Sequence, residues 1–148
     1  MKQRHDTAWR DIWSGLGAAL APGRCARAFC DRRVWAAVAL GLAGLPFSPG
    51  AMPPFWRLAL TALTEETAYR ALLQDQLEQM LPGRRGPLTT GALIASAIFA
   101  LSHLPTHTPL MACLTFLPSL VFGALWTRHR SIWLCAAMHC WYNVAFFL

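Results

Sequence analysis

The stretch PLTTGALIASAIFALSHLPTHTPLMACLTFLPSLVFGALWT, residues 87–127, contains no Asp, Glu, Lys or Arg. Two further uncharged runs cover residues 34–56 and 131–148. A helix needs about 20 mostly apolar residues to cross a bilayer. The whole chain is 55% hydrophobic and only 14% charged, whereas a typical soluble domain is about 25% charged. A soluble all-helical protein would lack the polar residues to cover these runs, so the pattern indicates a membrane protein.

Proline, glycine and charged residues divide the apolar runs into five expected helices. They cover about residues 34–47, 55–81, 88–104, 110–127 and 131–148. The fourth is expected to kink near Pro118. The sequence therefore predicts an all-α fold, a polytopic integral membrane helix bundle with about five transmembrane helices. Residues 34–148 would form the membrane domain, and residues 1–33 a basic N-terminal arm.

The N-terminal arm is expected to contain an amphipathic helix. Trp9, Ile12, Trp13 and Leu16 recur at helical spacing among charged residues, which is typical of a helix lying on a membrane surface. Pro22 is expected to end this helix.

Basic residues are unevenly distributed along the chain. Seven of the 13 Lys and Arg residues precede Val34, and the loops of the five-span arrangement carry 11 basic residues on one side and 1 on the other. The positive-inside rule then places the N-terminus in the cytoplasm and the chain in the inner (plasma) membrane as a multi-pass protein. The net charge is +6, but the sequence contains no patch in which basic and aromatic residues alternate. We therefore expect the lipid bilayer as a partner and no nucleic acid.

The stretch LTEETAYRALLQ, residues 63–74, places Glu65, Glu66 and Arg70 inside the second expected helix. A charge at mid-membrane costs about 2.5–3.5 kcal/mol on insertion scales. Glu66 and Arg70 are four residues apart and can form an ion pair on one helical face. Glu65 is turned by about 100° from Glu66. It therefore needs a partner on another helix.

Two other helices carry candidate pairs of residues four apart in the sequence, each with at least one polar member. Phe99 and His103 occur in the third helix, and His139 and Asn143 in the fifth. At about 1.5 Å per residue, Glu65 lies about 12 Å from Arg57, and His139 about 13 Å from the C-terminus. All these helix ends are on the outer side of the five-span arrangement. Polar groups in apolar helices tend to face one shared interior, so we expect them to meet in the outer half of the membrane.

If these polar groups lie together, they provide the components of a hydrolytic site that uses no Ser or Cys nucleophile. A carboxylate in an apolar pocket can act as a base toward water. A neighbouring His can hold or donate a proton. A second His and an Asn amide can donate hydrogen bonds to a developing oxyanion.

Three motifs give this pattern a family resemblance. EETAYR fits EExxxR, FALSH fits FxxxH and HCWYN fits HxxxN, in that order along the chain. The sequence over roughly residues 60–147 thus resembles the CPBP family of intramembrane proteases, which includes CAAX proteases and bacteriocin-processing enzymes. No motif position departs from the pattern, but the chain is short for the family.

The resemblance implies a glutamic-type endopeptidase that needs no cofactor. It implies Glu65 as the base that activates water, assisted by His103, with His139 and Asn143 forming the oxyanion site. Glu66 and Arg70 would organise the catalytic residues. The expected substrate is a membrane-associated protein or peptide with a C-terminal apolar segment, such as a C-terminal sorting or anchor segment, because short bacterial relatives resemble processors of sorting signals.

Other functions are left open by the same residues. Glu65, His103 and His139 could instead supply three ligands for zinc, although the chain has no HExxH motif. A non-catalytic membrane protein of the bacteriocin-immunity type is a second alternative. A transporter would usually show duplicated halves, and none is visible. Five cysteines form no CxxC motif and are expected to be free thiols.

Overall fold

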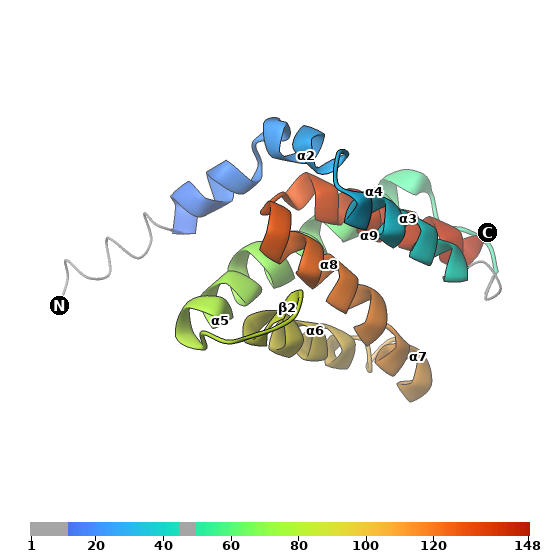
Figure 1. Ribbon diagram of the computed structural model, residues 1–148. Coiled ribbons are helices and arrows are strands. Elements are labelled where there is room, and N and C mark those ends of the chain that lie inside the picture. The colour runs from blue at the N-terminus through green and yellow to red at the C-terminus, as the bar shows by residue number, and fades with distance from the viewer. Residues whose placement is uncertain (1–11, 45–49) are drawn as a thin grey trace.

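The computed structural model describes residues 12–44 and 50–148, and this part of the chain is mostly helical (Figure 1). After a helix over residues 12–19, the elements in chain order are α2 (Pro22–Ala28), α3 (Arg32–Gly41), η1 (Leu42–Gly44), α4 (Phe55–Glu66), η2 (Thr67–Gln74), α5 (Asp75–Met80), β1 (Arg84–Arg85), β2 (Leu88–Thr89), α6 (Thr90–Ser102), α7 (Pro109–Leu114), α8 (Phe116–His129) and α9 (Ile132–Phe147).

The second expected helix is one continuous element from Phe55 to Met80, as predicted, but its middle is not α-helical. The segment η2 is a π-helix, in which the backbone closes wider turns. Pro54 precedes the helix start, and Leu81 leaves helical geometry with φ −126° and ψ 73°. The π-helical segment carries Arg70 and begins one residue after Glu66, so it directly shapes the polar stripe of this helix.

The turn after α5 forms a short antiparallel hairpin, which the five expected helices did not include. Arg84 pairs with Thr89 and Arg85 with Leu88, and Gly86 adopts φ +63° at its tip. Thr89 then caps α6, because its hydroxyl accepts a hydrogen bond from the Ala92 N–H at 3.0 Å. The hairpin leads directly into α6.

The fourth expected helix is interrupted, but three residues before the expected position. Helix α7 ends at Leu114, Thr115 separates the two elements and α8 begins at Phe116. The cause is still Pro118, because a proline ring clashes with the carbonyl four residues earlier, which here belongs to Leu114. Pro118 is therefore accommodated in the first turn of α8.

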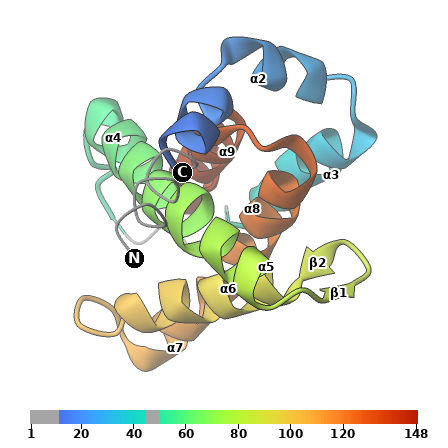
Figure 2. The same ribbon diagram turned by 90° about the vertical axis from the view of Figure 1, so that its left-hand side faces the viewer.

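Helix α9 lies at the centre of the bundle. It packs against α4, α8 and α3, and Figure 2 shows α4 and α8 on opposite sides of it. Helix α6 packs against α8 and against the η2–α5 part of the long helix. Ser131 caps α9 by accepting a hydrogen bond from the Leu134 N–H at 3.4 Å. The short connection from α8 depends on Arg130, which adopts the left-handed conformation with φ 49°.

The N-terminal helices cover one side of this bundle. A buried apolar cluster joins Ala19, Ala28 and Val34 to residues of α8 and α9, including Phe122 and Met138. Pro22 ends the helix over residues 12–19 as expected, and it also begins α2, an element that the sequence interpretation did not anticipate. Trp9, which was part of the amphipathic pattern, lies outside the described residues.

Large apolar side chains also cover much of the outer surface. They occur on every long helix and include Trp35, Trp56, Leu60, Leu101, Leu117 and Trp133, all of which are exposed. An apolar exterior of this extent is typical of a chain surrounded by lipid. Among the cysteines, all five are free, Cys135 and Cys140 are buried and Cys113 is exposed.

One helical stretch of the described residues, Pro109–His129, is long and apolar enough to cross a membrane. Thr90–Ser102 and Ile132–Phe147 are apolar but shorter. In the first expected span, residues 34–47, the part that the structure describes ends with η1 at Gly44. Residues 45–47 of that span lie outside the described residues. The helical fold is therefore confirmed, whereas the count of five spans stays a prediction.

Candidate active site

Glu66 is the last residue of α4 and its side chain is fully buried. One carboxylate oxygen accepts a hydrogen bond from Arg70 Nε at 3.0 Å. The other accepts from His139 Nδ1, on α9, at 2.8 Å. The ion pair with Arg70 was expected from the spacing of the two residues, and the structure confirms it. Glu66 is thus a buried acceptor shared between two helices.

Arg70 is also fully buried and is bound on all sides. Its terminal nitrogens donate to Ser119 Oγ at 2.6 Å, to Gln74 Oε1 at 3.4 Å and to Ser96 Oγ at 3.5 Å. Its guanidinium carbon lies 6.0 Å from the centre of the Phe99 ring. A buried cation is tolerated when its donors are satisfied. Arg70 therefore ties the long helix to α6 and α8.

Gln74 continues this stripe. It is fully buried, and its amide nitrogen donates to Glu78, to the Gly123 carbonyl and to Thr127. Glu66, Arg70, Gln74 and Glu78 follow one another at intervals of four residues. Four residues overshoot a full α-helical turn by about 40°, and the wider π-helical turn reduces that drift. The regular interval was a sequence signal that could have revealed Gln74.

Space for the stripe depends on small residues of the facing helices. A Cβ atom added at Gly123 would lie 3.3 Å from Arg70 Nη1 and 3.3 Å from Gln74 Oε1. Ser96 and Ser119 are fully buried and reach the same guanidinium. These two serines were missed from the sequence, because a single Ser in an apolar helix is common and carries no periodic signal.

Glu65 and His139 face each other beside the stripe. His139 Nε2 lies 3.7 Å from Glu65 Oε2, while its Nδ1 is bound by Glu66. The Glu65 side chain is 29% exposed and the Glu66 side chain is 0% exposed. The expected partner of Glu65 on another helix is therefore His139. Of the two carboxylates, only Glu65 is open to an incoming water molecule.

Aromatic rings fix the orientation of the imidazole. The His139 ring stacks on Phe122, with ring centres 5.0 Å apart and planes at 19°, and it meets the edge of Phe99 at 5.9 Å. Together with the bond to Glu66, these contacts allow one ring orientation. The Nε2 edge is thereby directed toward Glu65.

His103 and Asn143 lie near this centre without joining it. His103 ends α6, and its Nδ1 donates to the Phe99 carbonyl at 2.8 Å. Its ring lies 4.6 Å from the Phe99 ring, so Phe99 stands between the two histidines. Asn143 is half-buried one turn after His139 on α9, and no described residue bonds to its amide. The structure therefore brings together Glu65, Glu66, Arg70 and His139, and not the other two expected residues.

A metal site was the alternative interpretation of the same side chains. Within residues 12–44 and 50–148, no group of three or more His, Cys, Asp or Glu could hold a metal ion. Zinc would require His103 to approach Glu65 and His139 beyond the intervening Phe99 ring. The described residues in this arrangement do not fit a zinc site.

A buried Glu–Arg–His network inside an apolar helix bundle defines this chain as a helical membrane protein with a polar interior site. Comparison with family models gives the family: residues 48–145 match the one described as type II CAAX prenyl endopeptidase Rce1-like, and the chain belongs to this family. Searches of curated proteins and of solved structures find no match.

Family membership confirms the resemblance to the CPBP proteases. It makes the chain a member of a family of integral membrane proteins that are CAAX proteases, and hence hydrolases of protein or peptide substrates. All four residues that the structure brings together lie within the matched range, as do His103 and Asn143.

Proposed function

We propose that this protein is an intramembrane endopeptidase in which Glu65 activates the attacking water. The observation that carries the proposal is the asymmetry of the two carboxylates around His139. Glu66 is fully buried and bound by Arg70 and His139, whereas Glu65 is partly exposed and lies 3.7 Å from the other ring nitrogen. A general base needs access to water, and Glu65 has it.

The gap between Glu65 and His139 supports this division of roles. A separation of 3.7 Å is too long for a direct hydrogen bond. A water molecule near this edge could donate a proton to Glu65 while His139 orients it. Glu66, whose charge is neutralised by Arg70, would hold a proton on Nδ1 of His139. It would thereby keep the ring oriented with Nε2 toward Glu65.

The reaction follows from these positions. Glu65 takes a proton from water, and the water oxygen attacks the carbonyl carbon of the scissile peptide bond. The tetrahedral oxyanion is stabilised by hydrogen-bond donors, for which the unbonded amide of Asn143 and the Nε2–H of a doubly protonated His139 are the proposed groups. The carbon–nitrogen bond then breaks, and the proton held by Glu65 passes to the leaving amine. One water is consumed, and one carboxylic acid and one amine are formed.

His103 is proposed as an assisting base from the far side of Phe99. Because its Nδ1–H donates to the Phe99 carbonyl, the neutral ring presents the lone pair of Nε2. This lone pair could accept a proton when substrate enters between α6 and α9. Catalytic hydrogen bonds are often long in a free enzyme and tighten only with substrate, so the present separation is compatible with this role.

The proposed substrate is a membrane-associated protein cleaved near its C-terminal apolar segment. The family description names a CAAX prenyl endopeptidase, and a CAAX sequence lies at a C-terminus. Processing of a C-terminal sorting or anchor segment is the form of this activity that we propose. The expected location is the inner (plasma) membrane, with several spans and a cytoplasmic N-terminus.

Substitution of Glu65 by Gln tests the mechanism. We expect cleavage to fall by about 10²–10⁴-fold, because the side chain keeps its size and loses its basic oxygen. The measurement is mass spectrometry of protein C-termini in membranes of cells that express the wild-type or variant chain. Thr64→Val is the matched control, since Thr64 is exposed and bonds only to its own helix. Cleavage by Glu65→Gln at the wild-type rate would refute the proposed base.

The two alternatives predict different results. A zinc protease would lose activity in a strong chelator and regain it when zinc is restored, whereas the proposed enzyme keeps its activity. A non-catalytic immunity protein would still protect cells when Glu65 is changed to Gln, and no new C-terminus would depend on the chain.

A further inference from the structure

A cavity of about 560 Å³ opens between α3, α8 and the hairpin, away from the Glu–His centre. Figures 1 and 2 both show these three elements on the same side of the molecule. Its volume is in the range of small-ligand sites, roughly 300–1,000 Å³. The cavity uses the α8 residues Val121, Ala124 and Arg128. Thr127, a partner of Gln74, is part of its lining, but Glu65, Glu66, Arg70 and His139 are not.

Three arginines from three separate segments line this cavity: Arg33 of α3, Arg84 of β1 and Arg128 of α8. No Asp or Glu of the described chain is part of the lining. Arg128 bonds to Asp31 through Nε, and no described residue binds its terminal nitrogens. The guanidinium of Arg33 has no partner among the described side chains. Asp31 offsets the charge of Arg128, so the cavity keeps a net positive charge from Arg33 and Arg84.

Apart from Thr127, the rest of the lining is apolar and extends away from the arginines. On α3 it runs from Arg33 to Leu40, and on α8 from Arg128 back to Val121. Each distance is seven residues, or about 10 Å along a helix. Because the start of α3 and the end of α8 supply the arginines, the basic groups gather at one end. The other end is formed by Leu40 and Val121.

We propose that this cavity binds one anionic phospholipid, with its phosphate among Arg33, Arg84 and Arg128 and the first part of an acyl chain along α3 and α8. A basic mouth that opens onto an apolar floor is complementary to an amphiphile with an anionic head. Basic pockets between membrane helices on the cytoplasmic side bind anionic lipid head groups. All three arginines belong to the side that the charge distribution assigns to the cytoplasm.

This inference is independent of the chemistry at Glu65. It rests on insertion of the chain in a membrane, which family membership supports. The lipid would hold the hairpin and α3 against α8, so binding should stabilise the fold. The test can therefore measure binding and thermal unfolding without measuring peptidase activity.

The experiment titrates purified wild-type protein in detergent with phosphatidylglycerol, with phosphatidylcholine of the same acyl chains, and with soluble glycerol phosphate. Native mass spectrometry counts the bound lipid, and thermal unfolding reports stabilisation. We expect one phosphatidylglycerol to bind and to raise the melting temperature. Phosphatidylcholine should bind at least tenfold more weakly, and glycerol phosphate should give no shift.

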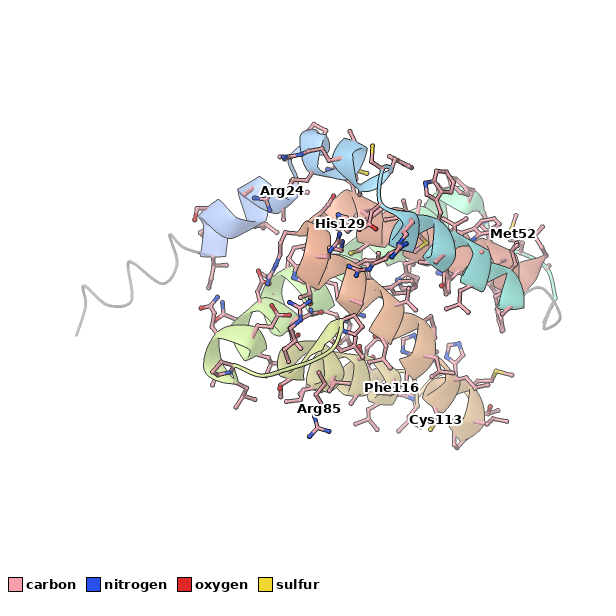
Figure 3. The ribbon with its side chains drawn as sticks, in the orientation of Figure 1. Arg24, Met52, Arg85, Cys113, Phe116 and His129 are labelled. Atoms are coloured by element: carbon pink, nitrogen blue, oxygen red, sulfur yellow. The ribbon has the colours of Figure 1, made fainter. Side chains whose placement is uncertain are left out.

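Two double variants with the same net charge make the charge test. Arg33→Gln with Arg84→Gln removes two lining arginines, and Arg32→Gln with Arg85→Gln removes their chain neighbours, which do not line the cavity. Figure 3 shows Arg85 pointing away from the body of the molecule. Each arginine near a membrane surface contributes about fivefold to binding of an anionic lipid, so the first double variant should bind about 30-fold more weakly. The second should bind as the wild type does.

A second pair of variants tests the apolar floor without changing charge. Ala36→Phe would fill the cavity, whereas Ala39→Phe, on the same helix and also exposed, would not. Loss of the bound lipid in Ala36→Phe alone would support the proposal. Equal weakening of phosphatidylglycerol binding in both double variants would mean that only general surface charge matters. That result would overturn the proposal. Equal stabilisation by glycerol phosphate would also overturn it, because the apolar floor would then have no role.

Discussion

Glu66 shows at the scale of one residue why a charge can be retained inside an apolar bundle. It has no exposure, and it is bound by a cation on its own helix and by an imidazole on α9. Glu65, the preceding residue, is partly exposed, and its partner His139 lies 3.7 Å away. Two identical side chains thus acquire different environments. The helical rotation of about 100° between them is the cause.

Arg70→Ala should harm the fold more than the chemistry. It leaves Glu66 buried and without its cation, and breaking a buried ion pair costs about 3–5 kcal/mol in soluble proteins. We expect a lower protein level and a lower melting temperature in detergent. Arg57→Ala, at an exposed position of the same long helix, is the control and should leave both unchanged. A stable but inactive Arg70→Ala protein would instead assign Arg70 a direct part in catalysis.

At the scale of helices, close contact between α5 and α6 fixes the polar stripe. A Cβ atom added at Gly91 would lie 2.7 Å from Glu78 Cγ, 2.8 Å from the Glu78 backbone nitrogen and 3.0 Å from the Gln74 carbonyl oxygen. Two of these atoms belong to the backbone and cannot rotate away. The two helices can approach this closely only because residue 91 is glycine.

Gly91→Ala should therefore push α6 away from the long helix. The expected cost is about 1–3 kcal/mol, as for overpacking in a core, and the hydrogen bond from Thr89 to Glu78 should be lost as well. Thermal unfolding in detergent measures the effect. Gly15→Ala is the matched control, since a Cβ there meets nothing within 4 Å and alanine favours a helix. Equal melting temperatures for the two variants would mean that these helices are farther apart.

The start of α3 is tied to the end of α8 by Asp31, which caps α3. The hydrogen bond from the Arg33 backbone N–H, and then the bond from the Arg128 side chain, lower the pKa of Asp31 from 3.8 to about 2. A lowered folded-state pKa gives stability that is present above the ordinary value of 3.8. That stability is lost as pH falls toward 2.

Asp31→Asn should remove this pH dependence. Asparagine caps a helix about as well as aspartate, so the variant loses the charge and keeps the cap. Thermal unfolding of both proteins between about pH 6 and pH 2 is the measurement. The wild type should be the more stable above about pH 4, and the difference should shrink toward pH 2. A difference that stays constant over this range would contradict the prediction.

At the scale of the whole molecule, basic residues gather at one end. Arg24 donates to the carbonyl of Arg130 at 3.2 Å, and these residues are far apart in the sequence. Figure 3 shows Arg24 beside α2, and Met52 and Cys113 toward the other end of the described chain. The separation agrees with the expected cytoplasmic and outer sides.

Labelling of single cysteines tests this orientation. In a variant without the native cysteines, Thr106→Cys should react with a membrane-impermeant thiol reagent in intact cells, and Arg85→Cys only after lysis. Both positions are exposed, and Arg85 is a better choice than its neighbour Gly86, whose φ of +63° would strain a side chain. The reverse pattern would place the site toward the cytoplasm and favour substrates that approach from that side.

The helical class, the family and the Glu66–Arg70 pair could all be predicted from the sequence alone. These follow from composition, from motif order and from spacing along one helix, which are local properties. The position of the break near Pro118 was also close, because the clash of a proline ring extends only four residues back. The four-residue interval of the polar stripe could also have predicted the burial of Gln74. The polar residues that follow it in the sequence instead favoured an exposed position.

Which histidine faces Glu65 could not be predicted from the sequence and depends on helix packing. The two candidates, His103 and His139, have the same residue type and similar spacing to a partner. Their contact with Glu65 depends on how α6 and α9 pack against α4, and Phe99 lies between His103 and the centre. The cavity lined by Arg33, Arg84 and Arg128 likewise joins segments far apart in the chain. Such pairings depend on helix packing over the whole molecule, which no local pattern encodes.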